Sequence, residues 1–259
     1  MKDISFGFIG AGRVTRFFLQ AFKNCNVSFK QITVIDPSIE VLTKIKRDFT
    51  EIGATADNLQ KVVQNDVIFI ALHSPLIMEM LEKIKPFLDQ KTVLVSLAPK
   101  ITVEKISLKL DGFQNIARLI PNAPSVINEG YNPVCFSGGM STTDKKLLIS
   151  IFEVLGKCIM VDESKLEAYA IITAMSPTYF WFQFNELFEI GKKIGLSEEE
   201  CRSGIIETIN ASVKTLFSSG MSAEKVIDLI PVKPISDHET EIKEIYHSKL
   251  IPLFEKIKP

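Results

Sequence analysis

The chain has 259 residues, is 46% hydrophobic and 24% charged, and carries a formal net charge of −1 at pH 7. This composition excludes a disordered chain, and the near-neutral charge gives no electrostatic reason to bind nucleic acid or an anionic membrane. The length allows one large or two modest domains. Cysteines at 25, 135, 158 and 201 have no paired spacing, so we expect reduced thiols in a cytoplasmic protein and no metal site.

The first segment of the chain combines a hydrophobic strand, a glycine turn and an amphipathic helix. Residues 4–9 supply the strand, and Gly10-x-Gly12-x-x-Thr15 follows it. The hydrophobic positions of the helix recur at i, i+3, i+4, i+7 and i+8, and they are Val14, Phe17, Phe18, Ala21 and Phe22. This spacing predicts that these five side chains form the buried face of the helix.

The turn has the form of a dinucleotide-binding loop. Gly10 permits the tight turn, Gly12 lets the backbone approach a pyrophosphate, and the unpaired N–H groups of the new helix face that anion. The other loop residues expected at the phosphates are Ala11, Arg13 and Val14. Thr15 stands where the fingerprint has glycine or alanine, so we expect slightly wider packing of strand and helix. A glycine turn of an ordinary α/β protein is the alternative.

Asp36 ends the next apolar run, about 20 residues after the motif, where the fingerprint places an acid that binds the adenosine ribose. A carboxylate about 4 Å from a 2′-phosphate would cost about 1 kcal/mol in water and about 4 kcal/mol at a protein surface. Asp36 therefore favours NAD, and Arg13 would offset part of this effect by pairing with the 2′-phosphate of NADP. The sequence slightly favours NAD, because Pro37 and Ser38 rather than an arginine follow Asp36.

Strands and helices alternate through the first 160 residues, which predicts an α/β fold with a mostly parallel, doubly wound sheet. After the first unit, the expected strands are 32–35, 67–72, 92–97, 115–120, 133–136 and 158–161. The expected helices are 38–49, a short one opened by a capping box at 57–60, 74–87 with Ser74 as its N-cap, one from Thr102, and 141–156.

From Asp162 onward only helical patterning remains. The expected helices are 164–194, opened or kinked at Pro177, then 197–219, 222–230 and 236–256. The change predicts a Rossmann dinucleotide-binding domain at residues 1–161 and an all-helical dimerisation and substrate domain at residues 162–259. Residues 168–185 carry no charge, but they include several polar side chains and no flanking basic cluster. We interpret them as a subunit interface of a homodimer, not as a membrane span.

Four segments together resemble the pyrroline-5-carboxylate reductase family, whose members reduce a cyclic imine to proline with a nicotinamide cofactor. PheIleGlyAlaGlyArgVal at 8–14 resembles the family's PheIleGlyAlaGlyAsnMet, and ValSerLeuAlaProLysIleThr at 95–102 resembles its ValSer-x-AlaAlaGly-x-Thr. The most specific match is ArgLeuIleProAsnAlaProSerValIleAsnGluGly at 118–130. Residues 161–168 resemble the start of the dimerisation helix. The resemblance implies a Rossmann domain followed by a helical domain that interlocks two subunits.

Departures from this family concentrate where it handles substrate. Its SerGlySerGlyProAlaTyr corresponds to residues 173–179, where small positions have grown, so we expect a narrower or differently shaped pocket. Its ProGlyGlyThrThr, whose threonine contacts the proline ring nitrogen, corresponds to ProValLysProIleSerAsp at 231–237. The family's lysine after the fourth strand corresponds to His73. Cofactor binding carries over from the resemblance, whereas substrate identity does not.

Hydride transfer to a C=N bond needs positioning and electrostatics from the protein, because the cofactor performs the redox chemistry. Candidate hydrogen-bond donors to the substrate are Asn122, Ser176, Thr178 and Tyr179. Further expected cofactor contacts at the carboxyl edge of the sheet are Ala71, Leu72, His73, Ala98 and Asn122. Each polar candidate also has a structural interpretation: Asn122 could tie a turn, Ser176 and Thr178 could satisfy backbone freed by Pro177, and His73 could bond backbone at a helix entry.

Three functions remain open from the sequence. The first is a reductase of a small cyclic imine, such as a pyrroline-5-carboxylate reductase. The second is a nicotinamide-dependent reductase of another small imine or of an oxo acid. The third is a cofactor-binding regulatory dimer without catalysis, which the missing ProGlyGlyThrThr motif supports.

Overall fold

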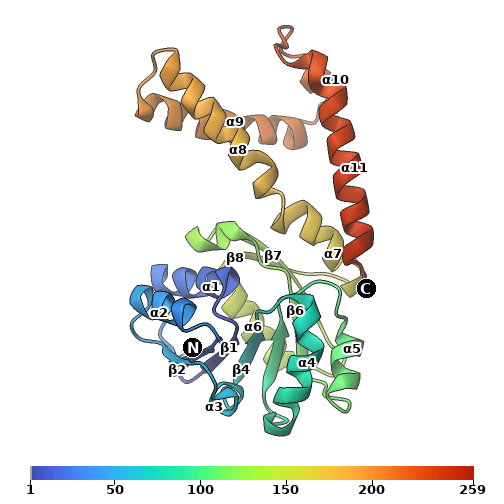
Figure 1. Cartoon of the computed structure of the whole chain (residues 1–259). Coiled ribbons are helices and arrows are strands. Elements are labelled where there is room, and N and C mark those ends of the chain that lie inside the picture. Colours follow the sequence, from blue (N-terminus) through green and yellow to red (C-terminus); the bar gives the residue numbers. More distant parts are fainter. Residues whose placement is uncertain (1) are drawn as a thin grey trace. The chain divides into compact units, whose positions relative to one another are not determined.

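The computed structural model describes residues 2–259, which form two compact units (Figure 1). The first unit holds the chain up to Met175 together with Phe254–Pro259, and the second is Ser176–Leu253. The helical unit is thus bounded on both sides by chain that belongs to the first unit.

Within residues 2–259, an eight-stranded sheet of order β3-β2-β1-β4-β5-β6-β7-β8 forms the centre of the first unit. Its strands are β1 (Ser5–Ile9), β2 (Gln31–Ile35), β3 (Gly53–Thr55), β4 (Val67–Ile70), β5 (Val93–Ser96), β6 (Ile116–Leu119), β7 (Gly130–Phe136) and β8 (Gly156–Met160). All neighbouring pairs run parallel except β6 and β7. The order of the first six strands is that of the doubly wound dinucleotide-binding fold, so the predicted fold class is confirmed. The strand β3 was not predicted, because three residues are too few to show an alternating pattern.

Helices cover both faces of this sheet (Figure 1). On one face lie α1 (Arg13–Asn24), α2 (Ile39–Asp48) and α6 (Thr142–Glu153), and on the other α3 (Leu59–Val63), α4 (Ser74–Ile84) and α5 (Val103–Lys109). The strand β4 shows why both faces are apolar: Val67 and Phe69 join the first core, whereas Ile68 and Ile70 join the second. A strand buried on both faces needs this continuous hydrophobic run.

The predicted buried face of α1 is confirmed in part, at Phe18, Ala21 and Phe22. Its buried residues are Thr15, Phe18, Leu19, Ala21 and Phe22. The expected Val14 and Phe17 are only half-buried. Thr15 can be buried because its hydroxyl donates a hydrogen bond to the Gly10 carbonyl oxygen at 2.6 Å, which satisfies the polar group away from water. Hydrophobicity alone could not assign this position.

Side-chain caps begin most helices of the first unit, with two corrections to the predicted starts. Ser38, Thr102 and Ser141 each accept a hydrogen bond from the backbone N–H three residues later. The helix α3 is capped by Asn58, not by the capping box predicted at 57–60, because the Asn58 side chain accepts from the Lys61 N–H. The N-cap of α4 is His73 rather than Ser74. A 3-10 turn, η1 (Lys85–Phe87), continues α4.

Short helical segments precede β7 and follow β8. A 3-10 turn, η2 (Ala123–Ile127), precedes β7; after β8 come the 3-10 turn η3 (Glu163–Lys165), α7 (Leu166–Tyr169) and the π-helical η4 (Ala170–Ala174). The predicted long helix is therefore interrupted before Pro177, as expected. Leu166 and Ala170 pack with Ile120 and Cys135, which explains why the first compact unit continues past the change to helices and ends at Met175.

The second unit consists of helices with little buried apolar surface. Its elements are α8 (Pro177–Lys193), α9 (Glu198–Ser218), α10 (Ala223–Ile227), the 3-10 turn η5 (Ser236–His238) and α11 (Glu239–Ile257), whose last residues belong to the first unit. The predicted capping box of Ser197 and Glu200 is confirmed. A Cβ on Gly191 would lie 2.6 Å from the Cys201 sulfur, so α8 and α9 approach closely there. In residues 2–259 no helix is long and apolar enough to cross a membrane.

Candidate functional site

The loop between β1 and α1 is built around its two glycines. Gly10 has a φ of +104°, and a Cβ there would lie 2.6 Å from the Ala71 carbonyl oxygen, so only glycine fits. Gly12 has a φ of −72°, which any residue adopts, and a Cβ placed on it would meet nothing within 4 Å. Neither backbone conformation nor packing requires glycine at this position. The open space at the start of α1 is what close approach of a pyrophosphate needs, so these residues fit a dinucleotide.

Asp36 lies beside this loop and is bound to it. Its Oδ2 accepts a hydrogen bond from the Ala11 N–H at 2.9 Å, and its Oδ1 accepts from the Ser38 N–H at 2.9 Å. The carboxylate thus connects the turn after β1 to the turn after β2, a role that the sequence analysis did not foresee. Each carboxylate oxygen can accept a second hydrogen bond, so Asp36 can still receive a ribose hydroxyl. The Ala11 N–H, however, is already engaged.

The crevice for a ligand follows from the strand order. The chain passes from β1 to β2 and β3 on one side, and then crosses to β4 on the other side of β1. In open parallel sheets, ligands bind outside the carboxyl ends of the strands at such a switch point. The predicted contacts on the second side directly follow β4 and β5, and they are Ala71, Leu72, His73 and Ala98. With Asp36 at β2 and the glycine loop at β1, the other end of an extended dinucleotide bound there would face β4 and β5.

Asn122 is buried between the end of β6 and the start of β7. Its Oδ1 accepts from the Tyr131 N–H at 2.9 Å, and its Nδ2 donates to the Thr173 carbonyl oxygen at 3.3 Å. The side chain therefore ties two loops together, as its structural interpretation proposed. One hydrogen of Nδ2 is left for a further acceptor.

The other three substrate candidates, Ser176, Thr178 and Tyr179, belong to the second unit. Ser176 is the N-cap of α8, which begins at Pro177. The ring of Tyr179 packs edge-on against that of Tyr246, with centroids 5.9 Å apart. Burial raises the pKa of the Tyr179 hydroxyl above its ordinary value, so the phenol is neutral at pH 7 and can donate a hydrogen bond.

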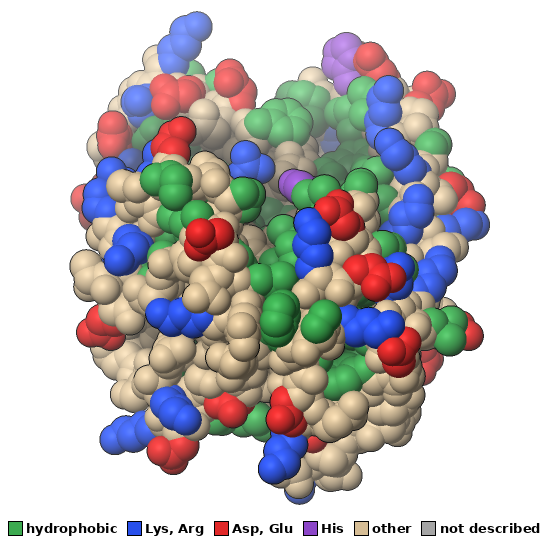
Figure 2. Space-filling view, turned by 60° about the horizontal axis from the view of Figure 1, so that its bottom comes forward, with side chains coloured by type: hydrophobic (Ala, Val, Ile, Leu, Met, Phe, Trp, Pro, Cys, Tyr) green, Lys and Arg blue, Asp and Glu red, His purple; other side chains and the backbone are tan. Residues whose placement is uncertain are grey.

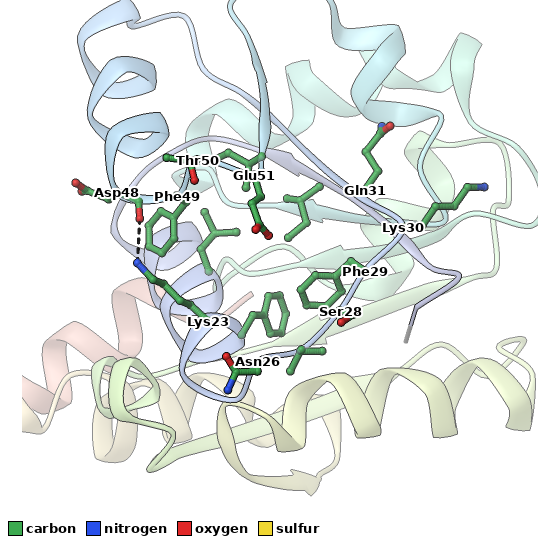
Figure 3. Close-up of a pocket in the computed structure, with 15 residues that line it drawn as sticks. Lys23, Asn26, Ser28, Phe29, Lys30, Gln31, Asp48, Phe49, Thr50 and Glu51 are labelled. Atoms are coloured by element: carbon green, nitrogen blue, oxygen red, sulfur yellow. Dashed lines mark hydrogen bonds between the residues drawn. The ribbon is translucent and has the colours of Figure 1, made fainter.

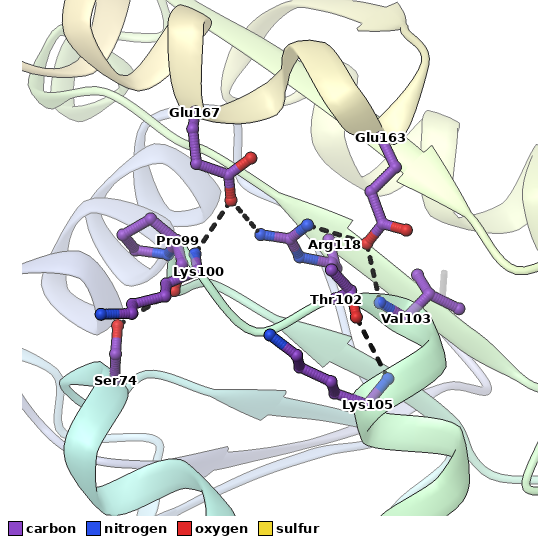
Figure 4. Close-up of polar contacts among 9 residues, drawn as sticks. All are labelled: Ser74, Pro99, Lys100, Thr102, Val103, Lys105, Arg118, Glu163 and Glu167. Carbon is purple, nitrogen blue, oxygen red and sulfur yellow. Dashed lines mark hydrogen bonds and ion pairs between the residues drawn. The ribbon is translucent and has the colours of Figure 1, made fainter. Parts of the chain in front are cut away.

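A buried charge cluster underlies the β5–α5 loop at the same edge of the sheet (Figure 4). Arg118 of β6 is fully buried; its Nη2 lies 2.5 Å from Oε1 of Glu167, and its Nη1 lies 2.8 Å from Oε1 of Glu163. The same oxygens accept backbone N–H groups of the loop, Glu167 from Lys100 at 2.9 Å and Glu163 from Val103 at 2.7 Å. Burial alone would lower the pKa of Arg118, but the two carboxylates raise it above its ordinary value. The guanidinium therefore stays charged and holds the loop in place.

Arg118 was predicted only as part of a family motif, and this cluster was not predicted. Two signals could have found it. An arginine within an otherwise apolar strand needs a buried partner, and Glu163 and Glu167 are spaced i, i+4 on a helical segment, which places both carboxylates on one face.

A cavity of about 540 Å³ lies elsewhere in the first unit (Figure 3). It is lined by Phe29 and Lys30, just before β2, and by Phe49, just after α2. Lys23 also lines the cavity, and its ammonium nitrogen lies 5.8 Å from the centroid of the Phe49 ring. These residues lie at the amino ends of the strands, whereas the glycine loop lies at their carboxyl ends. The cavity is therefore separate from the candidate dinucleotide crevice.

The remaining ionisable groups of residues 2–259 include no cluster of metal-ligating side chains. Among residues 2–259, no group of three His, Cys, Asp or Glu side chains could hold a metal ion. The four cysteines are free, and burial raises the pKa of Cys135 and of Cys158 to about 12. Figure 2 shows side chains of both charge signs, with hydrophobic ones between them, over the face that it presents, as the net charge of −1 suggests.

The sheet order, the glycine loop and the acid after β2 define a Rossmann-type dinucleotide-binding domain. A family model described as "NADP oxidoreductase coenzyme F420-dependent" matches residues 5–100. The pyrroline-5-carboxylate reductase of Pseudomonas aeruginosa is 22% identical over 220 residues, which cover 85% of this chain and 80% of that protein. Pyrroline-5-carboxylate reductase 2 of Rattus norvegicus is 26% identical over 197 residues, which cover 74% of this chain and 62%, less than two thirds, of that protein.

A solved structure extends the likeness over the whole chain. The pyrroline carboxylate reductase of Plasmodium falciparum with NADP bound has a TM-score of 0.81 and 24% sequence identity, covering 100% of this chain and 98% of that one. The chain therefore resembles the pyrroline-5-carboxylate reductase family in sequence and in fold, as the sequence motifs predicted.

Proposed function

We propose that this chain is an NAD(P)-dependent oxidoreductase that reduces the C=N bond of a small cyclic imine carrying a carboxylate, as a pyrroline-5-carboxylate reductase does. The observation that carries the proposal is the open space at Gly12 beside the constrained turn at Gly10. Likeness to reductases over most of the chain supports the reaction class.

Different residues at the carboxyl edge of the sheet then bind different parts of the cofactor. The N–H groups at the start of α1, with Gly12, Arg13 and Val14, receive the pyrophosphate, and Asp36 receives the adenosine ribose. The segment after β4, including His73, and Ala98 after β5 lie on the nicotinamide side. When bound, the reduced nicotinamide supplies a hydride to the imine carbon, and a proton on the nitrogen completes the amine.

The chain's own contribution to the reaction is positioning. An imine that arrives protonated is already the electrophile, so no side chain has to act as an acid. Holding the imine carbon in van der Waals contact with the hydride donor accounts for several kcal/mol of barrier lowering, about 7–11 kcal/mol at most. Asn122, Ser176, Thr178 and Tyr179 remain our candidates for orienting the substrate.

We further propose a homodimer formed through the helices of the second unit. Only Gly191 and Cys201 are buried in α8 and α9, whereas Phe182 and Phe217 are 68% and 79% exposed. A helical unit with so much exposed apolar surface needs a partner, and large exposed patches mark interaction sites. Sedimentation of the wild type and of Phe182→Asp tests this proposal, and a wild type that sediments as a monomer at micromolar concentration contradicts it.

A cytoplasmic location stays a prediction.

The decisive assay offers pyrroline-5-carboxylate with NADH and with NADPH and follows the loss of reduced cofactor. We expect turnover in the wild type and none in Gly12→Val, whose melting temperature should be unchanged because a Cβ there meets no atom within 4 Å. Titration of cofactor fluorescence shows whether the variant has lost binding. No turnover by a wild type that still binds the cofactor would remove the proline assignment.

A reductase of another small imine or of an oxo acid is the second candidate. It is motivated by residues 173–179, where Thr173, Met175 and Thr178 replace small residues of the related motif. A panel of cyclic imines and 2-oxo acids, assayed with both cofactors, separates the two functions.

A further inference from the structure

Lys100 holds a backbone conformation that lysine rarely adopts. Its φ is +79°, in the left-handed region that favours glycine. The Lys100 N–H donates to Oε1 of Glu167 at 2.9 Å, and the same oxygen is bound by the buried Arg118. Strained residues of this kind persist only where their surroundings fix them, and they concentrate at functional sites.

The position of Lys100 connects this strain to the candidate crevice. The residue lies in the loop between β5 and α5, at the carboxyl edge of the sheet. The Ser74 hydroxyl donates to the Pro99 carbonyl oxygen at 3.0 Å, which joins this loop to the start of α4, just after β4. Figure 4 shows the Lys100 side chain running toward Ser74 and away from Arg118. It therefore lies on the β4–β5 side of the crevice, opposite the end that Asp36 marks.

The ammonium group of Lys100 is available for a ligand. The residue is exposed, and among residues 2–259 no carboxylate forms an ion pair with its side chain. An ammonium is a compact charge with three hydrogen-bond donors. Placed beside the reactive end of the crevice, it matches an anionic group carried by the substrate.

We propose that Lys100 binds the carboxylate of the substrate and that Glu167 is the positioning residue that holds Lys100 in place. The inference rests on the proposed imine reduction, and it adds the group that selects carboxylated imines over neutral ones. Arg118 takes part only through Glu167, whose carboxylate it holds in position.

The first experiment compares pyrroline-5-carboxylate with 1-pyrroline, a cyclic imine that lacks the carboxylate. In Lys100→Met, which keeps an unbranched side chain as far as Cε and removes the ammonium, we expect the KM for pyrroline-5-carboxylate to rise at least tenfold. The KM for 1-pyrroline and the Kd of the reduced cofactor should change less than twofold. Lys100→Arg should retain most of the selectivity. An equal change for both imines, or a change confined to cofactor affinity, would overturn the proposal.

A binding measurement keeps this inference separate from the proposed function. Calorimetry with the cofactor-loaded protein compares L-proline with pyrrolidine, so turnover is not required. We expect Lys100→Met to weaken L-proline binding at least tenfold. If the wild type reduces no imine, the proposed function fails, and this titration still decides for or against Lys100. L-proline binding that is absent, or that does not depend on Lys100, contradicts it.

Two further variants test the strained backbone at Lys100 and the contact from Glu167 that holds it. Lys100→Gly relieves the left-handed conformation, so its melting temperature should be unchanged or higher while selectivity for the carboxylated imine is lost. A lower melting temperature with selectivity retained would show that Lys100 serves stability alone. Glu167→Gln should raise the KM for pyrroline-5-carboxylate severalfold. Glu163→Gln, which leaves the contact to Lys100 intact, is the matched control and should not.

Discussion

Two turns at the carboxyl edge of the sheet place a residue in the left-handed region, and they do so by different means. After β1 the residue is Gly10, with a φ of +104°, and after β5 it is Lys100, with a φ of +79°. At Gly10 a side chain would collide with the Ala71 carbonyl oxygen. At Lys100 the side chain is exposed, and the backbone N–H is bound by the Glu167 carboxylate.

This difference separates a turn that local sterics determine from one that a distant network determines. Any sequence that forms the first turn needs glycine, so the turn can be recognised from the sequence. The second turn tolerates lysine because Arg118 and Glu167 contribute the free energy that holds it. The turn after β1 is therefore fixed by its own backbone, and the turn after β5 by side chains that contact it.

The largest expected effect comes from removing the support of the second turn. Glu167→Ala leaves the charge of Arg118 without its fully buried partner, and breaking a buried ion pair in this way destabilises a protein by about 3–5 kcal/mol. Urea unfolding measures the change. Glu163→Ala is the control and should cost less, because the Glu163 side chain is 31% exposed and water screens its charge. Equal costs for the two variants would show that burial does not govern the cluster.

An effect of similar size is expected at the first turn. Gly10→Ala adds a strained φ, at about 1–3 kcal/mol, and a collision with backbone, at about 1–3 kcal/mol. Gly12→Ala is its matched control, since its φ of −72° suits alanine and the space around it is open; its free energy of unfolding should stay within about 0.5 kcal/mol of the wild type. If both variants unfold alike, the two glycines do not have the different roles assigned to them.

The smallest expected effect concerns the choice of cofactor, where we propose that NADH is preferred. Asp36→Asn keeps one oxygen to accept from the Ala11 N–H, gives up the bond from the Ser38 N–H and removes the negative charge. Relief of about 1 kcal/mol of repulsion should improve NADPH binding about fivefold and leave NADH binding nearly unchanged. Fluorescence titration with both cofactors measures the ratio. Tighter binding of NADPH by the wild type, unchanged in Asp36→Asn, would contradict the preference.

Most of the fold could be predicted because its information is local. Continuous apolar runs gave the buried strands, and Ser141, Ser197 and Thr102 marked helix starts through their own side chains. The exceptions have physical causes. The strand β3 is too short to show a period, and Thr15 is buried through a hydroxyl bond to Gly10 that hydrophobicity does not register.

The candidate site divides in the same way. Gly10, Gly12 and Asp36 follow a spaced motif and could be identified as a group. The contacts of Glu167 with Arg118 and with Lys100 join residues 49 and 67 positions apart, so no local pattern announces them. The left-handed conformation of Lys100 has a signal only by comparison, since Lys100 stands where the related ValSer-x-AlaAlaGly-x-Thr motif has glycine.

The chain's return to the first unit at Phe254 makes the helical unit an insertion and not a tail. Ile257, near the end of α11, packs with Leu166 and Ala170. A single protease cut in the loop after Ser218 would therefore release no fragment at once, since the carboxyl-terminal piece would still be docked through Ile257. The time that piece remains attached after cleavage would report how firmly the last turn of α11 is anchored.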